Sequence, residues 1–109
     1  MSEIQHVNEM EFNQFLLQAD RPVIVEFGAD WCAPCKRMRP VIQGLAEQWD
    51  GKALFFEINV DDSYALAMKY QVMSVPTLIL LVDGAVQGRL TGLQPLERIT
   101  AEFGPFINS

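Results

Sequence analysis

The sequence is poor in the side chains that usually bind metal ions. Its 109 residues include two cysteines, Cys32 and Cys35, and a single histidine, His6. A tetrahedral zinc site normally needs about four protein ligands, and the sequence offers no second CxxC and no Cys/His pair. His6 lies far from the cysteines along the chain, and we expect it to be a surface residue. We therefore expect no metal site, although a zinc ion or iron–sulfur cluster shared across a dimer stays open as an alternative.

Long hydrophobic runs and an excess of positive charge are also absent. The longest apolar run, Leu78 to Val82, is too short to span a bilayer. The N-terminal stretch Met1 to His6 has neither a positive segment nor a long apolar run, so we do not predict a signal peptide. Eight lysines and arginines against fourteen acidic residues give a net charge of -6, which repels phosphate backbones and anionic lipid. We therefore expect a cytoplasmic protein that binds neither nucleic acid nor membranes.

Length and composition favour one globular domain over residues 1–109. Half of the residues are hydrophobic and a fifth are charged, which is typical of an ordinary soluble protein. A chain of 109 residues is long enough to bury a core without a metal ion or several disulfides. In such a chain, a cytoplasmic cysteine pair is more often catalytic or metal-binding than structural.

The first part of the chain shows alternating strand and helix patterns. Residues 8–11 (NEME) resemble a capping box and predict a helix to about Ala19, preceded by a short strand at Ile4 to Val7. The expected inner face of this helix comprises Met10, Phe12, Phe15, Leu16 and Ala19. Val23 to Phe27 is apolar at odd and even positions, which is typical of a strand covered on both faces, and Glu26 interrupts that run.

The remaining elements continue the alternation and end with a β-hairpin and a helix. They are a helix from Cys32 to Trp49, a strand from Ala53 to Val60, a short helix from Ser63 to about Tyr70, strands at Thr77–Val82 and Ala85–Leu90, and a helix that begins at Pro95. The last helix should carry Leu96, Ile99, Phe103 and Phe106 inward. Strands that alternate with helices pair in parallel, whereas the hairpin adds an antiparallel portion. The pattern predicts an α/β fold with a mixed sheet and helices on both faces.

The two cysteines lie where a strand meets a helix, which matters more than their spacing. A thiol at a helix N-terminus faces unpaired N–H groups and the positive end of the helix dipole, so its thiolate is stabilised. We expect Cys32, the first and the more exposed cysteine, to be the nucleophile. Cys35, one turn later, is placed to attack a mixed disulfide and release the reduced partner. Pro34 should stiffen the loop and Lys36 adds a positive charge, so both are expected to tune the redox properties.

These features together resemble the thioredoxin family over almost the whole chain. The matching residues are Trp31-Cys32-Ala33-Pro34-Cys35-Lys36, the strand Val23 to Phe27, Pro40, Asn59-Val60-Asp61, Val75-Pro76-Thr77, Gly84 and Gly92. The resemblance implies the thioredoxin fold, a central, mostly five-stranded mixed sheet flanked by four helices. It also implies a redox-active Cys32–Cys35 disulfide and a protein-disulfide reductase that works through a mixed disulfide. The implied partners are disulfide-containing proteins and an NADPH-dependent thioredoxin reductase, no cofactor is implied beyond the disulfide, and we expect a monomer.

Two further positions gain roles through the resemblance. Val75-Pro76 corresponds to the family's cis-proline, which faces the cysteines and leaves the Val75 backbone free to pair with an extended substrate strand. Glu26 occupies the place of a buried acid behind the second cysteine and would relay the proton of Cys35. Burial should raise the pKa of Glu26. Glu57 stands where the family often has lysine, and a second carboxylate nearby would raise one of the two pKa values further.

An apolar patch around Cys32 is expected to bind substrate proteins. It comprises Trp31, Ala33, Pro34, Met73, Val75, Pro76, Gly92 and Leu93. Gly28 stands where many relatives have tryptophan, and Ala33 replaces the usual glycine, a change that tunes the redox potential. These departures leave two alternatives open: a specialised thioredoxin-like protein with one dedicated client, and a thioredoxin-fold module that binds or chaperones partners without using its thiols.

Overall fold

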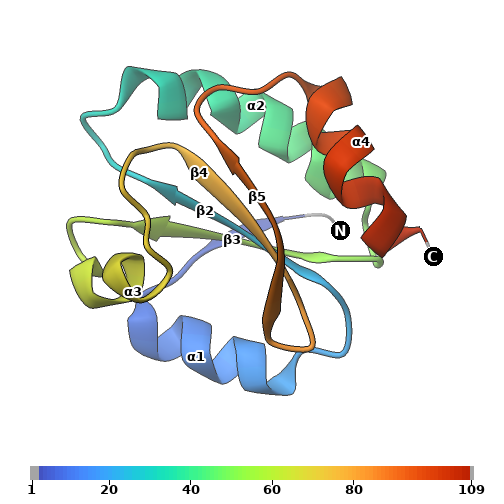
Figure 1. Ribbon diagram of the computed structural model, residues 1–109, viewed down its shortest axis with the longest axis horizontal. Coiled ribbons are helices and arrows are strands. Elements are labelled where there is room, and N and C mark those ends of the chain that lie inside the picture. The colour runs from blue at the N-terminus through green and yellow to red at the C-terminus, as the bar shows by residue number, and fades with distance from the viewer. Residues whose placement is uncertain (1–2, 109) are drawn as a thin grey trace.

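The computed structural model describes residues 3–108, which form a five-stranded sheet between two layers of helices (Figure 1). In chain order the elements are β1 (Ile4–His6), α1 (Glu9–Gln18), β2 (Val23–Gly28), α2 (Ala33–Gln48), β3 (Leu54–Asn59), α3 (Tyr64–Lys69), β4 (Thr77–Val82), β5 (Ala85–Thr91) and α4 (Leu96–Ile107). The predicted α/β order is confirmed, with the expected mixed sheet and helices on both of its faces.

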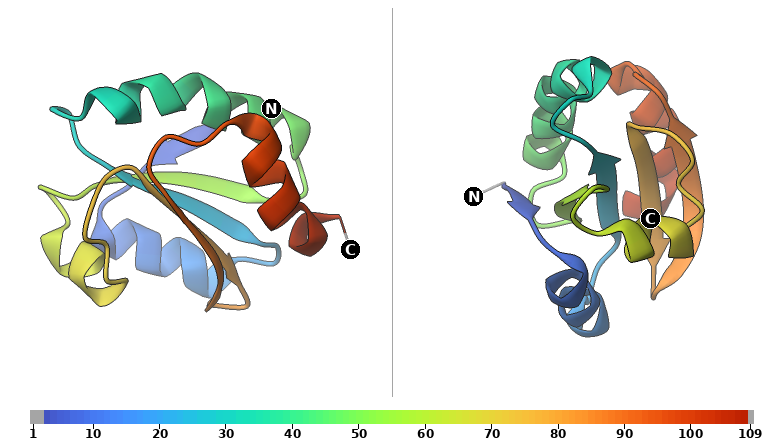
Figure 2. Two further views of the ribbon diagram at one scale, coloured as in Figure 1. Left: turned by 45° about the horizontal axis from the view of Figure 1, so that its top comes forward. Right: turned by 90° about the vertical axis from the view of Figure 1, so that its left-hand side faces the viewer.

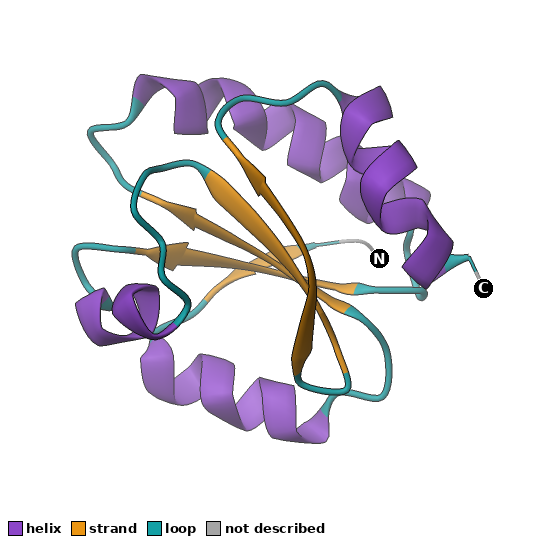
Figure 3. Cartoon of the chain, in the orientation of Figure 1, coloured by secondary structure: helices purple, strands orange, loops and turns teal. Residues whose placement is uncertain are grey.

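β2 lies at the centre of the sheet, whose strand order is β1-β3-β2-β4-β5 (Figure 3). β1, β3 and β2 run parallel, whereas β4 is antiparallel to β2 and β5 is antiparallel to β4. Because β2 has a paired strand on each side and helices on both faces, all six of its residues are buried. Glu26 is one of them, in register with Glu57 of β3 and Leu78 of β4.

Helices cover both faces of the sheet (Figure 2), and a hydrophobic core lies between the sheet and each helix layer. α2 and α4 cover one face, where Met38, Leu45, Trp49, Ile99 and Phe103 are fully buried. α1 and α3 cover the other face, where Phe12, Phe27, Phe56, Ile58 and Leu66 are buried. Successive residues of β2 alternate between the cores, and Ile24 belongs to the α2 side, so Glu26 points to that side as well. The sheet therefore directs this carboxyl group toward the helix that carries the cysteines.

α1 begins with the predicted capping box. The Glu11 backbone N–H donates to Asn8 Oδ1 at 2.8 Å, and the Asn8 N–H donates to Glu11 Oε1 at 2.9 Å. The prediction that Met10 faces inward is wrong, since its side chain is 71% exposed. Met10 precedes the buried Phe12 by two residues, which places it about 200° away around the helix.

α4 differs from its prediction at both ends. Pro95 is the N-cap residue and not the first helical residue. Phe106 is exposed where it was expected to be buried, and Ile107 is buried instead. Ile99, Phe103 and Ile107 repeat every four residues, which keeps them on one face of the helix.

Candidate active site

The two cysteines form a disulfide at the junction of β2 and α2. β2 ends at Gly28, and α2 begins directly after Cys32, its N-cap residue. The Cys35 backbone N–H donates a hydrogen bond to Cys32 Sγ at 3.2 Å. Pro34 lies in the first turn, where its missing N–H costs no helical hydrogen bond. The predicted strand-to-helix position is thus confirmed, and the sulfur of Cys32 lies at the positive end of the helix dipole.

Cys32 is not the more exposed of the two cysteines, so that prediction is wrong. Both residues are buried, with 3% of Cys32 and 8% of Cys35 exposed. As the N-cap residue, Cys32 turns its sulfur over the first helical turn toward the Cys35 N–H, which withdraws it from the surface. Position at the helix end, and not exposure, distinguishes the two thiols.

The loops that carry the expected substrate-binding residues meet at the end of the sheet where the disulfide lies (Figure 1). Thr77, the first residue of β4, pairs with Phe27 of β2, so Val75-Pro76 lies beside the end of β2. The Val75–Pro76 peptide bond is cis, as predicted. The Gly92 N–H donates to the Pro76 carbonyl at 2.8 Å, which fixes the loop after β5 against this proline.

Large apolar side chains at this end of the molecule are exposed. Trp31 is 70% exposed, Met73 90% and Leu93 46%, and we call these three residues the apolar surface. Among the other residues expected to bind substrate or tune the dithiol, Ala33 and Lys36 are exposed, Pro34, Val75 and Gly92 are half-buried, and Pro76 is buried. The Trp31 indole N–H donates to Asp61 Oδ2 at 2.9 Å, which links the cysteine loop to the turn after β3.

Glu26 is buried next to the dithiol, with 3% of the residue exposed. Its Oε2 has no hydrogen-bond partner among the residues that the structure describes. Burial, reinforced by the negative charge of Glu57 and a hydrogen bond with it, raises the pKa of Glu26 to about 8, while the Arg39 cation opposes that rise. The predicted direction of this pKa shift is confirmed.

Glu57 lies beside Glu26 and is held by two basic side chains. Arg39 Nη2 donates to Glu57 Oε1 at 3.1 Å, and His6 Nδ1 lies 3.0 Å from the same oxygen. The His6 side chain is 64% exposed, as expected for a surface residue, but it is also part of this cluster. This role was not predicted, because the parallel register of β1 with β3, which aligns His6 with Glu57, is not visible in the sequence.

Arg39 was also missed, although a sequence signal for it existed. It follows Cys35 by four residues on α2, and residues at that spacing share one helix face. Since Glu26 was expected behind Cys35, the shared helix face predicts that Arg39 also lies near this buried acid.

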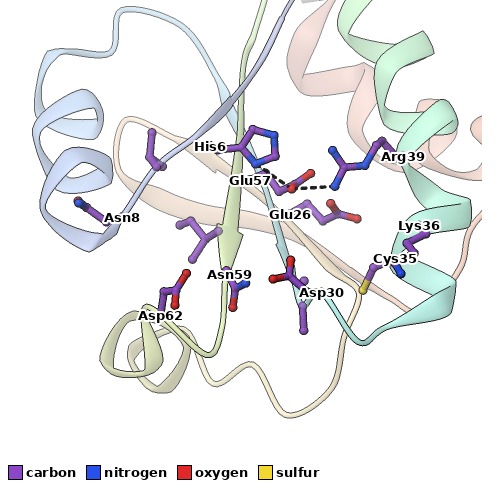
Figure 4. A pocket seen from close by; sticks show the side chains of 14 residues that line it. His6, Asn8, Glu26, Asp30, Cys35, Lys36, Arg39, Glu57, Asn59 and Asp62 are labelled. Carbon is purple, nitrogen blue, oxygen red and sulfur yellow. Dashed lines mark hydrogen bonds and ion pairs between the residues drawn. The ribbon is translucent and has the colours of Figure 1, made fainter.

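A pocket of about 640 Å³ joins these groups to Cys35 (Figure 4). We call it the acid pocket; its lining includes His6, Glu26, Gly28, Cys35, Arg39 and Glu57. A Cβ atom at Gly28 would lie 3.4 Å from Cys35 Sγ and 4.0 Å from Glu26 Oε1. The thiol and the carboxyl group therefore border the same space, which the missing side chain leaves open. A polar pocket of this size has room for bridging water molecules.

Residues 3–108 contain neither a helix that could span a membrane nor a cluster of metal-ligating side chains. No helix in this range is long and apolar enough to cross a membrane. No three histidine, cysteine, aspartate or glutamate side chains in it are grouped so that they would hold a metal ion. The reactive groups that the fold does bring together are two sulfurs and two carboxyl groups.

Known proteins resemble the chain in sequence and in fold. The family model described as Thioredoxin matches residues 3–103. The thioredoxin of Haemophilus influenzae is 38% identical over 108 residues, which cover 99% of this chain and 97% of that protein. The chloroplastic M-type thioredoxin of Brassica napus is also 38% identical, over 95% of this chain but only 59% of its own length. Among solved structures, a mutant thioredoxin from Halobacterium salinarum matches with a TM-score of 0.87 at 36% identity, covering 96% of this chain and 91% of that one.

Proposed function

Because the chain belongs to the thioredoxin family and is a thiol–disulfide oxidoreductase with a CxxC dithiol, we propose that Cys32 attacks substrate disulfides and that Cys35 resolves the intermediate. First, the Cys32 thiolate bonds to one substrate sulfur, and the other substrate sulfur leaves as a thiolate. Cys35 then bonds to Cys32, and the remaining substrate sulfur leaves. The substrate disulfide gains two electrons, and the dithiol becomes the Cys32–Cys35 disulfide.

The position of Cys32 as the N-cap residue of α2 supports this order of attack. Its sulfur accepts the Cys35 backbone N–H and faces the positive end of a sixteen-residue helix, so its thiolate is the better stabilised of the two. Cys35 lies inside the first turn and meets the mixed disulfide from behind. We assign the tuning of the dithiol to Ala33, Pro34 and Lys36, which fill and follow the loop between the sulfurs.

Glu26 is the proposed acceptor of the Cys35 proton. The resolving step needs the Cys35 thiolate, so its proton must leave for a nearby base. Glu26 Oε1 borders the same space as Cys35 Sγ, and the pocket that both residues line has room for a bridging water. A general base works best when its pKa lies near the operating pH, and the raised pKa of Glu26, about 8, meets that condition.

Substrate proteins would dock on the apolar surface and on the backbone beside it. Trp31, Met73 and Leu93 offer exposed apolar contacts, and Val75, Pro76 and Gly92 form the adjoining edge. An extended client segment could pair with that edge by strand addition. We further propose that a monomer acts in the cytoplasm and is re-reduced by an NADPH-dependent thioredoxin reductase. Cytosolic redox systems keep dithiols of this kind reduced.

Insulin reduction with NADPH and a thioredoxin reductase tests this function. The wild-type protein should turn over insulin disulfides repeatedly, whereas Cys35→Ser should stop at a mixed disulfide on Cys32. Equal turnover by Cys35→Ser would contradict the proposed roles. No turnover by the wild type with chemical reductant would favour a binding module, and turnover with chemical reductant alone would favour a protein with a dedicated partner, as the unusual Gly28 and Glu57 suggest.

A further inference from the structure

Glu26 and Glu57 lie side by side on neighbouring strands. The parallel pairing of β2 with β3 places them opposite each other, and paired positions direct their side chains to the same face. Glu26 is 3% exposed and the Glu57 side chain 14%, so both carboxyl groups are largely withdrawn from bulk water. Two like charges in such a place resist simultaneous ionisation. The pair therefore favours one negative charge over two.

The surroundings of this pair are asymmetric. Glu57 Oε1 is bound by Arg39 at 3.1 Å and by His6 at 3.0 Å. Glu26 Oε2, in contrast, is buried with no hydrogen-bond partner within residues 3–108. The basic neighbours favour the negative charge on Glu57, so the single proton of the pair is favoured on Glu26. That is the carboxyl group that borders Cys35.

We propose that Glu57 is a positioning residue of the disulfide exchange, held as an anion by Arg39 and His6 so that Glu26 takes up the proton of Cys35. The proposal rests on the role of Glu26 as proton acceptor, proposed above. It attributes the high proton affinity of Glu26 to the neighbouring charge of Glu57. In the resolving step, the Cys35 S–H bond breaks, an O–H bond forms on Glu26, and Cys35 Sγ bonds to Cys32 Sγ. The substrate sulfur leaves with the electron pair of its broken bond. The step starts from molecules in which both carboxyl groups are ionised, and it takes the pair from two negative charges to one.

Charged or titratable side chains face the acid pocket from every element around it (Figure 4). They are His6 from β1, Glu26 from β2, Lys36 and Arg39 from α2, Glu57 from β3, and Asp30 and Asp62 from the loops after β2 and β3. Of these, Arg39 and His6 are the groups within ion-pair distance of Glu57. Arg39 and Glu57 therefore act on the proton of Glu26 with opposite signs.

These opposite signs provide the test. The reduced protein is mixed with one equivalent of dithiobis(nitrobenzoate), and stopped-flow absorbance follows the first thiolate released by Cys32 and the second released by Cys35. The nitrobenzoate thiolate leaves without needing a proton, so the second phase reports deprotonation and attack by Cys35. Its pH midpoint, and that of the Glu26 carboxyl signal in a carbon-13 NMR titration of the oxidised protein, are measured for each variant.

We expect Glu57→Gln to move both midpoints down by about one pH unit and Arg39→Met to move both up by about as much. A merely structural disturbance would move the two variants in the same direction. Glu102→Gln and Arg98→Met make the same chemical changes in an exposed ion pair on α4, away from the acid pocket, and should leave both midpoints in place.

Two outcomes overturn the proposal, and a Glu26→Gln variant separates them. Glu57 has no positioning role if the midpoints stay fixed, or if they move in the same direction in Glu57→Gln and Arg39→Met. If Glu26→Gln nevertheless slows the second phase, Glu26 remains the proposed proton acceptor. A second phase that Glu26→Gln does not slow removes Glu26 as the acceptor, and the role of the pair with it.

Discussion

The apolar surface and the acid pocket both adjoin the disulfide, but they differ in exposure and in chemistry. The apolar surface consists of Trp31, Met73 and Leu93, which are 70%, 90% and 46% exposed. The acid pocket instead contains Glu26, which is 3% exposed and is the one acidic residue among the buried side chains of residues 3–108. In the proposed function, the first region binds the client protein, whereas the second acts on the dithiol whatever the client is. Changes in the two regions should therefore affect different measurements.

The largest expected effect of the acid pocket is a pH-dependent cost to stability. The pKa of Glu26 is about 8 in the folded protein, against 4.5 for an ordinary glutamate. Between these values the folded state keeps a proton that the unfolded state releases, so the free energy of unfolding falls as the pH rises. We expect the oxidised wild type to lose on the order of 4 kcal/mol between about pH 5 and about pH 9, relative to Glu26→Gln.

Urea denaturation of both proteins in the oxidised state at several pH values measures this difference. Glu26→Gln should become the more stable protein in the alkaline range, because its amide never has to ionise in the pocket. Glu102→Gln, an exposed replacement of the same kind, should follow the wild type throughout. If the free energy of unfolding changed equally with pH in the wild type and in Glu26→Gln, the buried carboxyl group of Glu26 would not destabilise the folded protein at high pH.

A methyl group at Gly28 should slow the chemistry in the acid pocket while leaving the stability of the protein nearly unchanged. The Cβ of Gly28→Ala would lie at ordinary contact distance from Cys35 Sγ, 3.4 Å, and would occupy the space shared with Glu26. We expect the second phase of nitrobenzoate release to slow by about threefold to tenfold, since the bridging path for the proton is blocked. The free energy of unfolding should change by no more than about 1 kcal/mol.

Gly44→Ala on α2 is the matched control for this substitution. Its added Cβ would meet only a distant Leu96 methyl at 3.9 Å, away from the acid pocket. It should leave the second phase unchanged. An equally fast second phase in Gly28→Ala would mean that the proton of Cys35 does not pass through this gap.

The parts of the fold and site that depend on local pattern were predictable from the sequence. The capping box at Asn8, the two-sided burial of Val23 to Phe27 and the turn at Asp83-Gly84 each act over a few residues, and the structure confirms all three elements. The position of Cys32 at a helix start follows from the same local signals.

The parts that depend on distant pairing were not predictable. Nothing near His6 in the sequence indicates that β1 aligns it with Glu57, because register is set by the whole sheet. The low exposure of Cys32 depends on a sulfur that folds back onto its own helix, which composition does not reveal. The acid pocket therefore became visible only when three strands and a helix were placed together.

The smallest expected effect lies on the apolar surface. Met73 is 90% exposed, so replacing it with serine removes one of the proposed client contacts without disturbing the core. We expect Met73→Ser to raise the KM for a protein disulfide such as insulin by roughly threefold, which corresponds to about 0.7 kcal/mol of lost docking energy. The second phase of nitrobenzoate release should stay at the wild-type rate, because this small reagent does not need the docking surface. Leu17→Ser on α1, 88% exposed on another part of the molecule, controls for the loss of an apolar surface group and should change neither measurement. If Met73→Ser slowed the second phase as well, the apolar surface would contribute to the chemistry of the dithiol, and the division of tasks between the two regions would fail.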